Sequence, residues 1–216
     1  MKVALTGAAG DFGTAITRLL LPDERITEIV GIDVAPLRLE HEKLRAERCD
    51  VRSPELREHL DGAEAVVHLA FMIVPGRDVD AAHEINVDGS RNVLEAAAEA
   101  GARRLVVASS LSAYSAPAPG LEPVDDEAFP AGTPERFYFR EKAQVEHLLD
   151  WWQAAHPDSG MTITRLRPGF IYGPDFDNPA LALMGSPLAV LPDDGGRTQL
   201  IHQDDLAGAF REAIVR

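Results

Sequence analysis

The sequence is poor in cysteine, in basic residues and in long apolar runs. Its 216 residues include one cysteine, Cys49, which excludes an internal disulfide and a cysteine-rich metal site. Lysine and arginine number 21 against 35 acidic residues, and the net charge of −14 argues against nucleic acid or an anionic membrane as partner. No apolar run could span a bilayer, and the N-terminus lacks the layout of a signal peptide. We therefore expect a cytoplasmic protein; its histidines show no metal-ligand spacing, so no metal site is expected.

Short apolar runs alternate with helical patterns along the chain. The runs are Val3–Leu5, Ile29–Asp33, Ala65–Ala70, Leu105–Ser109 and Met161–Leu166. They are rich in β-branched residues and lack polar alternation, as strands buried on both faces do. Between them, apolar stripes such as Val145, Leu148, Leu149 and Trp152 recur at helical spacing. This alternation predicts an α/β fold with a Rossmann-type, doubly wound parallel sheet.

A glycine-rich segment, Thr6 to Gly13, directly follows the first predicted strand and opens an apolar helical segment. Gly7, Gly10 and Gly13 would let the backbone turn tightly and approach a pyrophosphate at the helix N-terminus. Asp33 ends the second predicted strand, where an acid can take both ribose hydroxyls of an adenosine and would repel a 2′-phosphate. The pattern favours NAD over NADP, with Arg38 close enough to leave NADP as the alternative.

A tyrosine and a lysine share one helix face farther along the chain, as Tyr138 and Lys142. We expect the lysine ammonium to lower the pKa of the phenol, which could then exchange a proton with a substrate hydroxyl or carbonyl during hydride transfer. Ser109, Ser110 and Ser112 follow a predicted strand at the edge where ligands bind, and one hydroxyl could hold the substrate oxygen.

The ordered set of motifs resembles the extended short-chain dehydrogenase/reductase superfamily, in its NAD-dependent epimerase/dehydratase family. The matching segments, over nearly the whole chain, are TGAAGDFG at 6–13, Asp33, CDVRSPE at 49–55, VVHLA at 66–70, INVDGSRNVLEAA at 85–97, VVASSLSAY at 106–114, YFREK at 138–142, RLRPGFIYGP at 165–174 and LIHQDDLAGAF at 200–210. One departure is Ser115, where the family often has glycine.

The resemblance implies a role for each matched residue. The catalytic group would be Ser110, Tyr138 and Lys142, with Ser112 close enough to contest the part of Ser110. The cofactor would contact Gly7, Gly10, Asp11, Phe12, Gly13, Asp33, Asp50, Val51, Leu69, Ala70, Asn86, Ser109, Tyr138, Lys142 and Pro168. Asp50 and Val51 would border the adenine, and Lys142 would bind the nicotinamide ribose.

The resemblance also bears on domains and assembly. It implies an NAD-binding Rossmann domain at 1–172, part of a small, incomplete C-terminal substrate-binding lobe at 173–199, and a helix returning to the Rossmann domain at 200–216. A homodimer is expected through the segments near 88–100 and 137–155.

The implied activity is that of an NAD-dependent oxidoreductase or epimerase acting on a secondary alcohol, such as a sugar nucleotide, with Tyr138 as acid and base. Dehydration is disfavoured because Leu111 and Ser112 stand where dehydratases of this group carry an acidic pair. Residues 71–74, Phe-Met-Ile-Val, are expected to pack in the core, with an apolar substrate wall as the alternative. The alternative from another class is a dinucleotide-binding sensor or regulatory protein without catalysis.

Overall fold

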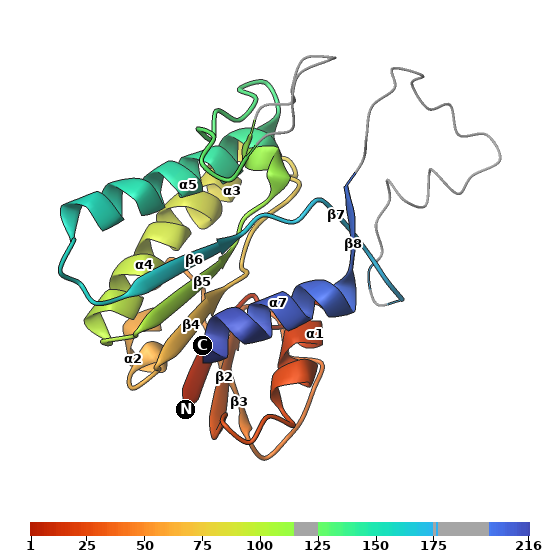
Figure 1. Ribbon diagram of the computed structural model, residues 1–216, viewed down its shortest axis with the longest axis vertical. Helices are drawn as coiled ribbons and strands as arrows, with labels where there is room; N and C mark the ends of the chain where they lie inside the picture. The colour runs from red at the N-terminus through yellow and green to blue at the C-terminus, as the bar shows by residue number, and fades with distance from the viewer. Residues whose placement is uncertain (115–124, 175, 177–198) are drawn as a thin grey trace.

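A six-stranded parallel sheet organises the computed structural model, which describes residues 1–114, 125–174, 176 and 199–216 (Figure 1). The strands are β1 Lys2–Thr6, β2 Glu28–Asp33, β3 Leu44–Arg48, β4 Ala65–His68, β5 Arg104–Ala108 and β6 Thr162–Leu166. Their spatial order is β3-β2-β1-β4-β5-β6, and every neighbouring pair is parallel. The predicted Rossmann-type sheet is therefore confirmed.

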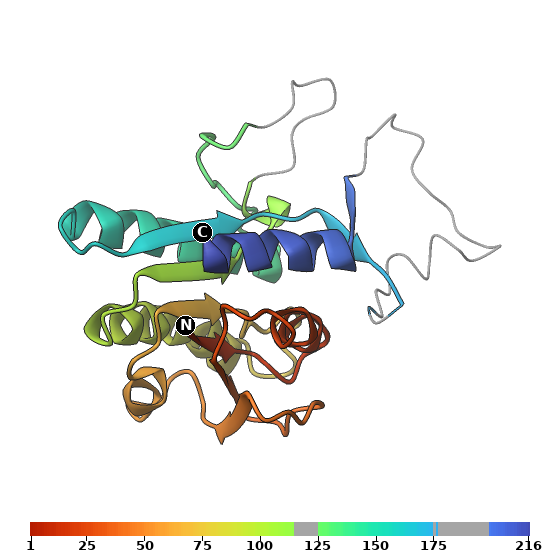
Figure 2. The ribbon, with the colours of Figure 1, turned by 60° about the horizontal axis from the view of Figure 1, so that its bottom comes forward.

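Helices cover both faces of the sheet (Figure 2). The helical elements are α1 Asp11–Leu20, α2 Leu56–Leu60, α3 Val79–His83, the π-helical turn η1 Glu84–Asp88, α4 Gly89–Glu99, the 3₁₀ turn η2 Leu111–Ala113, α5 Phe137–Ala155 and α7 Gln203–Val215. One face packs against α1 and α7, and the other against α2, α4 and α5. Within the described ranges, no helix is both long and apolar enough to cross a membrane.

Alternate residues of each central strand feed the two cores. On β1, Val3 and Leu5 face α1 and α7, whereas Ala4 faces α2, α4 and α5. On β4, Ala65 and Val67 again separate from Val66 in the same way. Because both faces are covered, the middle of each strand needs apolar residues on both sides, which is why β1 and β4 contain short continuous apolar runs.

The edge strand β3 was not among the predicted strands. Its sequence LRAER carries three charged residues, and it pairs only with β2. Its side chains are exposed or half-buried, so the apolar signal of a central strand is absent. The short parallel pair β7 Phe170–Tyr172 and β8 Leu200–His202 was also not predicted.

The order of strands reverses direction between β1 and β4, which creates a crevice at their carboxyl ends. The loops that follow β1, β2, β3 and β4 all reach this edge. Most of the lobe expected at 173–199 lies outside the described residues, as does part of the predicted loop at 115–136. α7 lies beside α1, against the same core cluster.

Candidate functional site

A cleft of about 320 Å³ opens at the carboxyl edge of the sheet, at the crevice beside β1 and β4. It is lined by Gly7, Gly10, Ile32, Asp33, Val34, Cys49, Asp50, Val51, Leu69, Ala70, Phe71, Met72 and Ile85. These residues come from the ends of four successive strands and from η1. The cleft is mostly apolar with few polar groups, as small-molecule and cofactor sites commonly are.

The turn after β1 is built so tightly that side chains are excluded from it. Gly7 has φ +74°, and a Cβ there would lie 2.6 Å from the Ala70 nitrogen. A Cβ on Gly13 would lie 2.3 Å from the Gly7 oxygen. The helix α1 begins directly after Gly10, which provides no side-chain cap for its first N–H groups. Such a helix N-terminus is suited to a phosphate, so the turn fits the pyrophosphate of a dinucleotide.

Asp33 lies on the cleft wall at the end of β2. Its carboxylate accepts one hydrogen bond from the Ala9 nitrogen and another from the Ala35 nitrogen, each of 3.0 Å. These bonds fix its orientation and still leave lone pairs for ribose hydroxyls. Nearby, Arg38 forms an ion pair with Asp11 at 2.6 Å. Arg38, the residue considered as a ligand for a 2′-phosphate, is therefore already paired with a carboxylate.

Asp50 and Val51 line the same cleft, directly after β3. Arg52 hydrogen-bonds the Asp50 carboxylate through its backbone and guanidinium nitrogens, and this lowers the pKa of Asp50 despite partial burial. Asp50 is therefore ionised at neutral pH and paired with Arg52.

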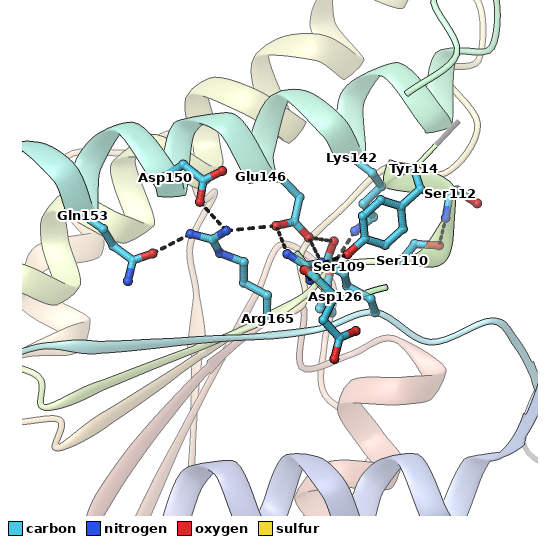
Figure 3. A network of polar contacts seen from close by, with 12 residues as sticks. Ser109, Ser110, Ser112, Tyr114, Asp126, Lys142, Glu146, Asp150, Gln153 and Arg165 are labelled. Atoms are coloured by element: carbon cyan, nitrogen blue, oxygen red, sulfur yellow. Dashed lines mark hydrogen bonds and ion pairs between the residues drawn. The ribbon is translucent and has the colours of Figure 1, made fainter. Parts of the chain in front are cut away.

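The proposed redox residues meet beside this cleft. Ser110 follows β5 and Tyr138 lies in the first turn of α5, and the Ser110 side chain acts to lower the pKa of the Tyr138 phenol. Ser110 also accepts a 3.1 Å bond from the Ser112 nitrogen (Figure 3). The effect of Ser110 on the phenol favours Ser110 over Ser112 as the serine of the site.

Lys142 does not lower the pKa of Tyr138 in this structure, so that expectation was wrong. Burial raises the pKa of the phenol, and the influence of the Ser110 side chain offsets only part of this effect. The Lys142 ammonium instead donates a 2.7 Å bond to the Ala108 carbonyl and lies 5.7 Å from the centroid of the Tyr138 ring. Burial lowers the pKa of Lys142 to about 7, although Glu146 acts in the opposite direction.

Glu146 is the centre of a buried ionic network one helical turn beyond Lys142 (Figure 3). Arg167 binds both of its carboxylate oxygens, at 2.8 and 2.9 Å, and Arg165 lies 3.3 Å away. Ser109 donates its hydroxyl to the same carboxylate. Burial alone would raise the pKa of Glu146, but these bonds more than reverse it, so the pKa lies below its usual range.

This network joins α5 to the ends of β5 and β6. The hydroxyl of Ser109, expected at the cofactor, is used to hold Glu146. The carbonyl of Pro168 accepts a 3.0 Å bond from the Leu111 nitrogen and so connects the end of β6 to η2. Both residues therefore support the Ser110 segment in this structure.

A second buried chain of hydrogen bonds lies beneath the other side of the cleft. The Ser90 hydroxyl donates to the Asn86 carbonyl, so Nε2 of His68 must donate to Ser90, and Nδ1 accepts from Thr6. Burial lowers the pKa of His68 to about 3, which keeps the ring neutral. The Asn86 amide bonds the nitrogen and carbonyl of Met72, so Asn86 shapes the cleft wall from behind.

Other predicted residues have mixed positions. Phe12 packs edge-on against Phe210 of α7 at 4.9 Å, so only its backbone faces the phosphate turn. Core packing of residues 71–74 holds only in part, because Ile73 and Val74 are 65% and 73% exposed. Phe71 packs against the core and also lines the cleft. Phe71 and Glu146 were not among the predicted site residues. The available signal for Glu146 was its place four residues after Lys142, which itself stands four residues after Tyr138 on the same helix.

No group of three or more histidine, cysteine or acidic side chains in the described ranges could hold a metal ion.

Comparison with known proteins agrees with this architecture. The model of the NAD dependent epimerase/dehydratase family matches residues 3–216. L-arabinose 1-dehydrogenase (NAD(P)(+)) of Haloferax volcanii is 32% identical over 184 residues, which cover 81% of this chain and 68% of that protein. The chain also spans 20% of uncharacterised mycobacterial proteins that it matches over its full length.

The solved structures that are similar over 100% of this chain include the following two. MoeE5 in complex with UDP-glucose and NAD is 26% identical, with a TM-score of 0.80 over 72% of its length. The UDP-glucose 4-epimerase of Thermus thermophilus, in complex with NAD, is 28% identical, with a TM-score of 0.77 over 75% of its length. NAD, the cofactor expected from the sequence, is thus the cofactor named for the family and bound in both structures.

Proposed function

Because this chain belongs to the NAD dependent epimerase/dehydratase family, we propose that it is an NAD-dependent oxidoreductase or epimerase acting on a secondary alcohol of a sugar or sugar nucleotide. The observation that carries the proposal is the cleft lined by Gly7, Gly10 and Asp33, with the Tyr138 ring packed at 5.7 Å against Phe71 of the cleft wall. The sugar class is supported by the arabinose dehydrogenase and by the UDP-glucose 4-epimerase among its relatives.

The cofactor would be held by residues around the cleft. The turn of Gly7, Gly10 and Gly13 would receive the pyrophosphate, and Asp33 the adenosine ribose. Asp50 and Val51 would border the adenine. Bound NAD would supply the acceptor for a hydride from the substrate carbon.

The chain's own residues would handle the proton and the orientation of the substrate. Ser110 would hydrogen-bond the substrate oxygen and direct it toward the Tyr138 phenol. Tyr138 would accept the hydroxyl proton in the oxidation and return it in the reverse direction. Since burial raises the pKa of Tyr138, approach of the Lys142 ammonium would be needed to stabilise the phenolate. Leu111 and Ser112 offer no acid and base for an elimination, which argues for dehydrogenation or epimerisation rather than dehydration.

A panel of sugars and sugar nucleotides, assayed with NAD, tests this function. Tyr138→Phe should reduce turnover by about 10² to 10⁴ while leaving NAD affinity within about twofold. Ser110→Ala should also be impaired, whereas the matched control Ser112→Ala should keep most activity because only its backbone nitrogen bonds Ser110. Full activity of Tyr138→Phe on a turned-over substrate would refute the assignment. Tight NAD binding without turnover of any substrate would favour the sensor alternative.

A homodimer through α4 and α5 is also proposed. Trp151, on α5, is 65% exposed, and Phe129 stacks on His147 of the same helix at 4.7 Å. An exposed tryptophan on a predicted contact helix suits an interface. Sedimentation should show a dimer that Trp151→Glu converts to a monomer, and a monomeric wild-type protein would overturn this assembly.

A further inference from the structure

Phe71 lies between the cleft and the redox residues. It follows β4 and lines the cleft wall next to Ala70 and Met72. The Lys142 ammonium lies only 3.6 Å from the centroid of its ring, which is a close cation–π contact. The Tyr138 ring meets it edge to face at 5.7 Å. A single aromatic ring therefore contacts the cleft and both proposed redox residues of α5.

The Phe71 ring lines the cleft and contacts Tyr138 and Lys142. The lining of the cleft includes the adenosine side, from Gly7 and Asp33 to Val51, and then Phe71 and Met72. Among the described residues that line it, Ser110, Tyr138 and Lys142 do not appear. Among the described residues, the Phe71 ring thus lies between the cleft lining and the Lys142 ammonium, which it contacts at 3.6 Å.

The position of Lys142 depends on the same ring. Its ammonium is buried and is held by the Ala108 carbonyl and the face of Phe71. A buried ammonium without these contacts would be strongly destabilised, so the ring offsets part of the cost of keeping it charged. In this arrangement the ammonium faces the ring instead of the cleft.

We propose that Phe71 is a gate that holds the Lys142 ammonium behind its ring, and that the ring must turn aside before a nicotinamide ribose can reach Lys142. This inference rests on the proposed function, because it assumes that the dinucleotide extends from Asp33 toward Lys142. Phe71 is then a positioning residue. Opening the gate costs the cation–π contact, and only ligands that extend beyond the adenosine half bear this cost.

Calorimetric titration with AMP and with NAD separates the two halves of the cleft. In Phe71→Leu, the affinity for NAD should rise by about threefold to tenfold, as expected from loss of one desolvated cation–π contact in the free protein. The affinity for AMP should stay within about twofold. Met72→Leu is the matched control, since Met72 lines the same wall, and no contact of its side chain with Lys142 is seen in the described structure.

A double-mutant cycle tests whether the gate acts through Lys142. In a Lys142→Met background the NAD gain from Phe71→Leu should fall below about twofold, because no cation remains for the ring to hold. Thermal unfolding of each variant establishes that it is folded, and Phe71→Tyr, which keeps the ring, should bind both nucleotides like the wild type.

The outcomes are distinct. Weaker binding of NAD and AMP alike in Phe71→Leu would show a passive wall and overturn the gate while leaving the proposed function standing. An unchanged NAD gain in the Lys142→Met background would also overturn it. Failure of folded wild-type protein to bind either nucleotide would overturn the proposed function and the gate with it.

Discussion

Replacing Glu146 with glutamine should destabilise the protein strongly. The carboxylate is fully buried and is bound by Arg167, Arg165 and Ser109. Glutamine keeps the shape and some hydrogen bonds but removes the charge. Two guanidinium groups, whose side chains are only 16% and 12% exposed, would then share a site without their buried counter-charge.

The magnitude follows from the cost of an unpaired buried charge. Breaking a buried ion pair by removing one partner costs about 3–5 kcal/mol. In a chain of this size each kcal/mol lowers Tm by about 2–4 °C, so Glu146→Gln should lose about 6–20 °C. Asp150 provides the control, because it also pairs with Arg165 but is 54% exposed. Asp150→Asn should cost less than about 1 kcal/mol.

Thermal and urea unfolding of both variants, followed by circular dichroism, measure this difference. The pKa of Glu146 is lowered in the folded state, so its stabilisation is present above the unfolded pKa of about 4.3 and is lost as the pH falls through the folded value. The gap between wild type and Glu146→Gln should therefore shrink in acid. Equal stability of Glu146→Gln and Asp150→Asn at neutral pH would show that the buried charge of Glu146 does not stabilise the fold.

Three further variants probe the rest of the site. Burial lowers the folded pKa of Lys142 to about 7, so the unfolding free energy of the wild type should rise with pH above that value. Lys142→Met lacks this group, so the unfolding free energy of the wild type should gain on that of the variant by about 1.4 kcal/mol per pH unit between about pH 7 and 9. A constant difference between the two proteins would contradict the pKa shift. Asp33→Asn should reduce the preference for NAD over NADP by about tenfold or more in calorimetric titrations, since the repelling charge is removed; an unchanged ratio would show that Asp33 does not face the ribose. Gly13→Ala should lower NAD affinity by at least about tenfold, because its Cβ would lie 2.3 Å from the Gly7 oxygen, whereas Gly208→Ala, with open space in α7, should leave binding unchanged and stabilise the fold by about 0.5–1 kcal/mol.

The central strands were predictable because their physical requirement is simple. A strand covered on both faces needs a run of apolar residues, and β1, β4 and β5 provide one at 3–5, 65–67 and 105–108. The edge strand β3 needs no such run, and its residues LRAER carry no signal of a strand. The tight turn at Gly7 and Gly13 was also predictable, because only glycine tolerates the close approaches found there.

The contacts of the site were predictable only in part. Local spacing placed Tyr138 and Lys142 on one helix face, and the resemblance identified Ser110. Neither of these could show where the flexible Lys142 side chain ends. Its ammonium lies on the ring of Phe71, which stands 71 residues earlier in the chain. The predicted direction of the pKa shift of Tyr138 was wrong for the same reason. Burial depends on tertiary packing rather than on spacing along the helix, and it raises the pKa of the phenol.

Side-by-side calorimetric titration of the purified chain with NAD and NADP tests whether the cleft is a site for NAD. We expect NAD to bind, and to bind more tightly than NADP, because Asp33 lines the cleft and Arg38 is paired with Asp11. Tighter binding of NADP would contradict the role of Asp33. If thermal unfolding shows that the sample is folded and neither dinucleotide binds, the cleft is not a cofactor site.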